Sequence, residues 1–347
     1  MPAALCDPVD AARGSSGGVR RHAGLMLNMP LKFRIPPPGD FTVAPDSPVS
    51  DAFSLGCQLW ISLKHVPVTA EAVGWLSLLS KSLDIGRQLR LDHDALSHVG
   101  MAAVERLFLE THTHVHAVCR PLVKAGAGNL PAGRPTTETR KALRLYAAWC
   151  INSELELLAD LSDKRTLDDI WEPHTARRLI RDLGAARPEY ERLLGPIPED
   201  SDQELALDRK KSEEALQATK TELLGLVATI SLEPMLKRLK QKLEKAREQK
   251  KLRGVPSFPA VYAIMSGDAV PTVREQPKNA AVGFTYSWYS VDSLQLHGSS
   301  LALEFDRAEI GPRLLAPSSA SPDDLAQLLR DLLFRLAFLR SYLPHDA

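Results

Sequence analysis

An arginine and a glutamate lie four residues apart in the segment Arg106-Leu-Phe-Leu-Glu110. On a helix this spacing places the two charged groups next to each other on one face. The flanking residues are apolar, which is typical of a helix inside a bundle, where a charged side chain needs a partner or a task. Arg106 is therefore a candidate anion or phosphate binder, and Glu110 a candidate catalytic partner. The alternative is a solvated ion pair on a helix surface.

A second polar group occurs far along the chain, in Ser293-Leu-Gln-Leu-His297. If this segment is helical, one continuous stripe contains Tyr286, Tyr289, Ser293 and His297. A histidine there can bind a carboxylate and stay partly protonated near neutral pH, so His297 is a candidate acid–base residue and the other three are candidate binding residues. The alternative is a core histidine whose hydrogen bond to Ser293 or to a backbone carbonyl is structural.

Three histidines alternate with other residues in His112-Thr-His114-Val-His116. His112 and His116 share a helix face at a spacing that can hold a transition metal. A closed site needs two further ligands, and the chain has no HExxH motif. We therefore expect no metal and no cofactor.

The segment 237–253 is rich in lysine and arginine. It can contact phosphates, which makes RNA a candidate partner. Because no aromatic residue is interleaved for base stacking, the alternative is a solvated helix face balanced by the acidic residues of 199–214.

The motifs at Arg106–Glu110, at Arg140-Lys-Ala-Leu-Arg-Leu-Tyr146 and at Ser293–His297 followed by Gly-Ser together resemble a family of uncharacterised bacterial all-helical proteins, classed as a domain of unknown function. The resemblance covers residues 50–305 loosely and departs from the family at the charged insert 200–253. It implies a helical fold and a polar site, not a reaction. Arg106, Glu110 and His112 are more distantly similar to the HEPN group of helical ribonuclease domains, which act in toxin and phage-defence systems.

Helical periodicity predicts the elements that position these residues. We expect an all-α, multi-helix bundle with a protruding charged helical hairpin. The predicted regions are a flexible Pro/Gly/Ser-rich arm at 1–48, a bundle core at 49–198, the hairpin insert at 199–254, and C-terminal helices completing the bundle at 255–347. Residues 254–282 are predicted to be irregular, and 284–305 to be a helix or a strand.

The segment 205–253 is strongly helix-prone, and Ser231-Leu-Glu-Pro234 interrupts it. This pattern predicts either a helical hairpin of coiled-coil character or a kinked long helix. A protein partner, or a second copy of the chain, is expected to bind there.

The overall composition is that of a globular protein, with 347 residues, 44% hydrophobic residues and no net charge. Zero net charge excludes a generally basic nucleic-acid binder, so any such contact needs a local patch. The four cysteines have no paired spacing, and the most apolar stretch, 325–343, is interrupted by charges. We therefore expect a soluble, cytoplasmic protein without a membrane span.

Two function hypotheses follow if Arg106 and Glu110 face Ser293 and His297 across the bundle core. In the first, the protein is a nuclease-like effector of bacterial defence that acts on RNA, with His112 or His297 assisting cleavage. In the second, it is a non-enzymatic binding or scaffold protein. The polar tetrad is then structural, and the hairpin binds a partner or dimerises.

Overall fold

The chain is mainly helical in the part that its computed structural model describes. The described residues are 48–62, 66–91, 98–124, 137–172, 175–197, 201–249, 251–252, 256–279 and 322–343. They form helices and no strand, which confirms the all-α fold class. None of these helices combines the length and the apolar character that crossing a membrane requires.

The contacts divide the chain into two compact units, which are described separately. Unit 1 comprises 1–148 and 238–347, and unit 2 comprises 149–237. The predicted regional boundaries at 48, 198 and 254 follow composition rather than contacts, and they stay predictions. The helices are α2 (Pro48–Ile61), α3 (Ala70–Leu91), α4 (His98–Lys124), α5 (Thr137–Leu161), α6 (Lys164–Trp171), α7 (Ala176–Leu183), the short η6 (Gly184–Ala186), α8 (Arg187–Leu194), α9 (Ser201–Thr229), α10 (Glu233–Glu248), α11 (Phe258–Ser266), α12 (Glu275–Asn279) and α15 (Pro322–Arg340).

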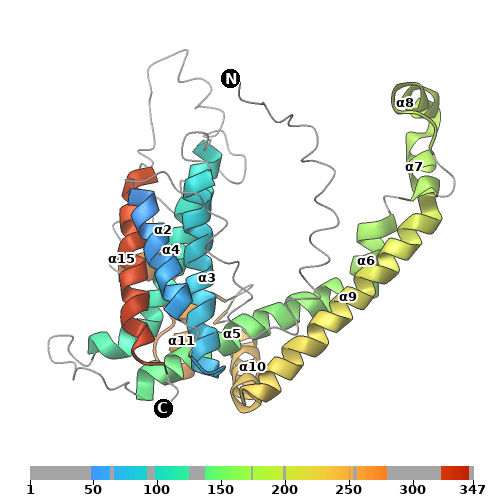
Figure 1. Cartoon of the computed structure of the whole chain (residues 1–347). Coiled ribbons are helices and arrows are strands. Elements are labelled where there is room, and N and C mark those ends of the chain that lie inside the picture. The colour runs from blue at the N-terminus through green and yellow to red at the C-terminus, as the bar shows by residue number, and fades with distance from the viewer. Residues whose placement is uncertain are drawn as a thin grey trace, which may run out of the picture. The chain divides into compact units, whose positions relative to one another are not determined.

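Unit 1 is a bundle in which α2, α3, α4 and α15 pack together, and α11 and α12 lie against α4 (Figure 1). Its largest fully buried side chain is Trp75 on α3. The indole Nε1 of Trp75 donates a buried hydrogen bond of 2.8 Å to the carbonyl oxygen of Leu336 on α15. This bond satisfies the one polar atom of the largest core side chain, and it joins helices that are distant in the sequence.

Gly74, next to Trp75 on α3, marks a close approach to α5. A Cβ atom at this position would lie 2.2 Å from the carbonyl oxygen of Leu143, so the two helix backbones touch there. Gly56 on α2 is also tight, but its nearest neighbour, at 2.6 Å, is the Cδ2 atom of the Leu83 side chain. A side-chain end can move aside, whereas a helix backbone cannot.

Polar contacts join α9 to α6 and α7 in unit 2. The N-caps of α6 and α7 are Asp163 and Thr175, whose side chains accept backbone hydrogen bonds. Asp202 on α9 accepts a hydrogen bond from the backbone N–H of Ala176. Arg209 on α9 pairs with Asp168 on α6, with 2.8 Å between nitrogen and oxygen.

A tight turn separates α9 from α10. Ser231 has a left-handed backbone with φ 52°, and the N–H of Leu232 donates to the carbonyl oxygen of Val227 at 3.0 Å. This pattern is the usual left-handed end of a helix. The predicted interruption at 231–234 is therefore confirmed, and it is a turn between two helices rather than a kink in one.

The structure corrects two predictions of local structure. Residues 254–282 are not wholly irregular, because α11 and α12 lie within them. Pro259 stands in the first turn of α11 and Gly267 ends it in the left-handed conformation, so both residues delimit a helix instead of breaking one. Helical periodicity also predicts one short helix at about 175–194, but this segment is broken at Gly184, which has φ 48°.

Gly74→Ala tests the crossing of α3 and α5. We expect it to lower the free energy of unfolding of unit 1 by about 3 kcal/mol or more, because a methyl group there overlaps a backbone carbonyl. Gly56→Ala should lower the free energy of unfolding clearly less, since the methyl group of Leu83 can move aside. Gly225→Ala in α9 is the control: nothing lies within 4 Å of its Cβ position, so alanine should stabilise that helix by up to about 1 kcal/mol. Denaturant titration followed by circular dichroism measures all three, and equal losses for Gly74→Ala and Gly56→Ala would contradict the crossing.

Candidate functional site

Helix α4 carries the densest set of chemically active side chains in the described chain. Its 27 residues include Arg106, Glu110 and the three histidines of the 112–116 segment. The helix lies against α3, α11, α12 and α15, so one side of it faces the bundle core. Which polar groups are buried therefore depends on the rotational position of each residue on α4.

Arg106 and Glu110 form an ion pair at the surface of α4. The distance from Nε to Oε1 is 3.3 Å, and the two side chains are 30% and 46% exposed. The buried acid on this turn is the preceding residue, Glu105, which is 2% exposed. An ion pair as accessible as Arg106–Glu110 contributes about 0.5 kcal/mol or less to the free energy of unfolding, since water screens the two charges.

His112 lies inside unit 1 and is 5% exposed. The centre of its ring lies 5.7 Å from that of Phe108, and the two rings are tilted against each other. Within the described residues its Nδ1 atom has no hydrogen-bond partner beyond its own backbone. Burial, followed by the positive charges of Arg335 and His116, lowers the pKa of His112 to about 4. The imidazole is therefore neutral at neutral pH.

A buried aromatic cluster surrounds the second histidine. The Nδ1 atom of His114 lies 3.4 Å from the hydroxyl oxygen of Tyr146 on α5, and Phe258 on α11 packs edge-on against Tyr146 at 4.7 Å. The ammonium of Lys81 on α3 lies over the Tyr146 ring, 5.8 Å from its centre. Burial and then the Lys81 charge hold the pKa of His114 well below its usual value. Four helices therefore meet at this tyrosine.

His116 and Cys119 follow His112 and His114 along α4. Burial, Arg335 and Arg120 lower the pKa of His116. Burial raises the pKa of the Cys119 thiol to about 12, so it is protonated and unreactive at neutral pH. Within the described residues no three His, Cys, Asp or Glu side chains are placed to hold a metal ion. The positive charge of Arg335 beside His112 and His116 also disfavours a bound cation.

The structure locates only part of the predicted site. Arg106 and Glu110 are paired with each other at the surface, and His112 is in the core. The four other predicted site residues lie outside the described residues, namely Tyr286, Tyr289, Ser293 and His297. The predicted tetrad across the bundle therefore stays a prediction.

Sequence reasoning did not anticipate that Lys81, Tyr146 and Phe258 would meet at His114. Tyr146 is the last residue of the motif at 140–146, and no local pattern links it to Lys81 or Phe258. Comparison with protein-family models, with curated proteins and with solved structures found no match.

Acid should destabilise unit 1 through His112. Its pKa is about 4 in the folded protein and near 6.5 in the unfolded chain, so between these values only the unfolded chain binds the proton. The free energy of unfolding is then greatest above pH 6.5 and falls as the pH drops towards 4, by up to about 3 kcal/mol for this residue.

His112→Gln removes that titration, so the pH dependence of unfolding, measured by denaturant titration between pH 8 and about pH 4, should become shallower. His116→Gln is the control with a smaller expected change, because His116 is partly exposed. An unchanged pH dependence in His112→Gln would show that the histidine is not buried in its neutral form.

Proposed function

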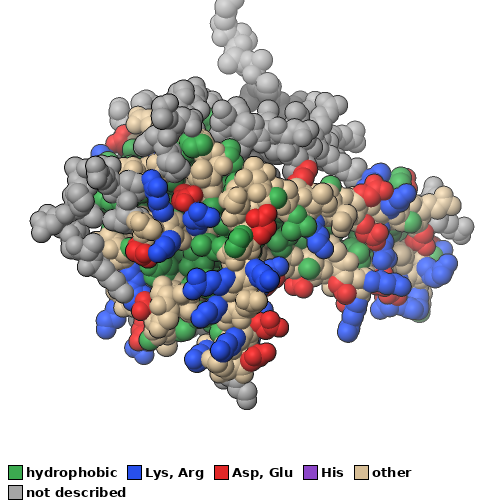
Figure 2. All heavy atoms as spheres, turned by 90° about the horizontal axis from the view of Figure 1, so that it is seen from below, with side chains coloured by type: hydrophobic (Ala, Val, Ile, Leu, Met, Phe, Trp, Pro, Cys, Tyr) green, Lys and Arg blue, Asp and Glu red, His purple; other side chains and the backbone are tan. Residues whose placement is uncertain are grey.

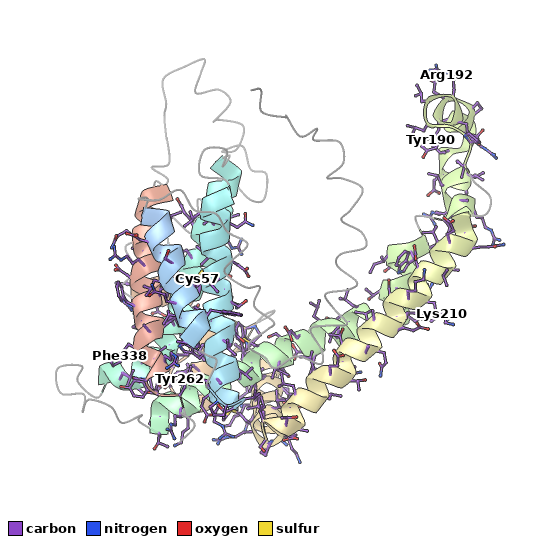
Figure 3. All side chains as sticks on the ribbon, viewed as in Figure 1. Cys57, Tyr190, Arg192, Lys210, Tyr262 and Phe338 are labelled. Carbon is purple, nitrogen blue, oxygen red and sulfur yellow. The ribbon has the colours of Figure 1, made fainter. Side chains whose placement is uncertain are left out.

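We propose that this protein is a non-enzymatic scaffold that forms a homodimer through unit 2. The observation that carries the proposal is α8, an eight-residue helix with no buried side chain. Its last two residues, Leu193 and Leu194, are 63% and 73% exposed. Figure 3 shows Tyr190 and Arg192 projecting from the same helix. So short a helix is marginal by itself and is stabilised when its apolar residues pack against another surface.

Other parts of unit 2 also expose large hydrophobic side chains. They are Leu157 on α5, Ile170 on α6, and Leu207 and Leu224 on α9. Scattered apolar residues are normal on a surface, and here four of them lie on three helices of the same unit, where a protein partner would cover them. The predicted binding role of the 205–253 segment is consistent with this distribution.

The charges of α8 support a second copy of the chain as the partner. Arg187 pairs with Glu191, and Arg192 pairs with Glu189, each at 2.6 Å. These charges are balanced within the helix, and the whole chain has no net charge. Two copies therefore approach without long-range repulsion, and no oppositely charged partner is required.

An RNA-cleaving defence effector is the second hypothesis, and the geometry gives it less support. An acid–base catalyst works best with a pKa near the working pH, whereas burial lowers the pKa of His112 to about 4. The positive charge of Arg106 is partly offset by Glu110. Since the cysteines have no paired spacing, we place the scaffold in the cytoplasm.

Leu193→Ser with Leu194→Ser tests the dimer. We expect the wild-type chain to form dimers at micromolar concentration in analytical ultracentrifugation, and the double variant to dissociate at least about tenfold more readily, because serine removes most of the apolar area. Val68→Ser is the control, since Val68 is 42% exposed but lies in unit 1. A wild-type chain that stays monomeric at about 100 µM excludes the proposal.

An RNA degradation assay separates the two hypotheses. For a scaffold we expect no cleavage by the wild-type chain, and melting temperatures within a few degrees of wild type for Arg106→Ala, because its ion pair is exposed. Cleavage that disappears in Arg106→Ala, His112→Gln or His297→Ala variants of unchanged stability would establish the enzyme instead.

A further inference from the structure

Helix α10 has a buried leucine face and an exposed basic face. Leu236, Leu239, Leu243 and Ala246 recur at helical spacing and are all at most 6% exposed. The other side of the helix is exposed and carries, besides Arg247, five cationic side chains, which are named the α10 basic face. They are Lys237, Arg238, Lys240, Lys242 and Lys245. The leucines therefore anchor the helix in the protein and turn its cations outward.

The α10 basic face differs from the basic residues 209–211 of α9 in its ion pairing. Within the described residues, none of its five side chains has a carboxylate partner. On α9, in contrast, Arg209, Lys210 and Lys211 each pair with a carboxylate. Figure 2 shows Lys and Arg side chains standing out on the face turned to the viewer, and Figure 3 shows Lys210 on α9.

Four acidic residues of 202–214 have partners close to them. Asp202 accepts a hydrogen bond at the start of α7, Asp208 pairs with Lys211, Glu213 with Arg209, and Glu214 with Lys210. These four carboxylates are therefore engaged within unit 2. The alternative drawn from the sequence, in which the acidic residues of 199–214 balance the basic run, stays a prediction. The five cations of the α10 basic face, which have no carboxylate partner among the described residues, are the groups that a ligand can contact.

The spacing of the cations matches that of a nucleic-acid backbone. Lys237 and Lys245 are about 12 Å apart along the helix axis, since each residue rises 1.5 Å. Arg238, Lys242 and Lys245 follow one another at four and three residues, so each turn presents a cation on that flank. One strand of a duplex offers a phosphate about every 3.4 Å of axis, so α10 spans about four phosphates.

We propose that the α10 basic face binds the phosphate backbone of double-stranded nucleic acid without reading its sequence. Four of the five cations are lysines, which contact phosphates as point charges, and no aromatic residue on this face can stack on a base. Contacts of this kind position a protein on a duplex but carry no sequence information.

Two other ligands fit α10 less well. A helix that binds an anionic membrane inserts an apolar face, whereas the apolar residues of α10 are buried in the protein. An acidic protein partner is disfavoured because lysine is depleted in protein–protein interfaces, while the aromatic residues that anchor them are absent from this face. The inference does not depend on dimerisation through unit 2.

Fluorescence anisotropy with a labelled RNA duplex of about 20 base pairs, and with a DNA duplex of the same sequence, tests the inference. We expect both duplexes to bind. A plot of the logarithm of the association constant against the logarithm of the salt concentration should have a slope of about −3.5, which corresponds to four phosphate contacts. Lys242→Gln with Lys245→Gln should weaken binding at least about tenfold at low salt and reduce the slope by about 2.

Lys210→Gln with Lys211→Gln removes the same charge from a surface where both lysines are paired, and binding should change less than about twofold. Circular dichroism checks that both double variants keep their helices. No duplex binding at low salt, or an equal loss in the two variants, would overturn the inference. Binding to vesicles of anionic lipid in place of the duplexes would overturn it as well.

Discussion

The close contact between the backbones of α3 and α5 is the constraint on which much of unit 1 depends. It exists because Gly74 has no side chain, so the carbonyl of Leu143 can approach to where a Cβ atom would otherwise lie. One turn beyond that carbonyl, Tyr146 then contacts His114 on α4 and Phe258 on α11. One residue beyond the glycine, the indole of Trp75 donates its hydrogen bond to the carbonyl oxygen of Leu336 on α15. A single missing methyl group therefore determines how α5 joins the bundle.

The same packing explains the chemistry of the histidines. His112 and His114 are nearly as buried as the leucines around them, and burial is the largest cause of their lowered pKa values. Neutral imidazoles fit an apolar interior at small cost, whereas imidazolium ions do not. The positive charge of Arg335 reinforces the effect of burial at His112. The histidine-rich turn of α4 therefore has the properties of a core and supports a structural role.

Charge is distributed differently in the two surfaces to which we assign binding roles. In unit 2 several charged residues pair with each other, as Arg209 does with Asp168 and Glu213, and the exposed leucines are the feature that can attract a partner. On α10 the leucines are buried, and the five cations of the basic face have no carboxylate partner among the described residues. The exposed leucines of unit 2 favour an apolar protein surface as the partner. The α10 basic face favours a polyanion. A scaffold with both would hold two copies of the chain on one duplex.

Local sequence determined the helices and several of their ends, because caps and periodicity act over a few residues. Thr69 accepts the backbone hydrogen bond that begins α3, and the interruption at 231–234 separates α9 from α10 as expected. Pro259 and Gly267, which mark the start and end of α11, are residue types that loops also favour, so the sequence alone does not distinguish the two. Only the tertiary structure decided that Arg106 lies at the surface while Glu105 is buried, and that the five cations of the α10 basic face have no carboxylate partner among the described residues. Exposure and pairing depend on contacts between residues far apart in the chain, and no local pattern records them.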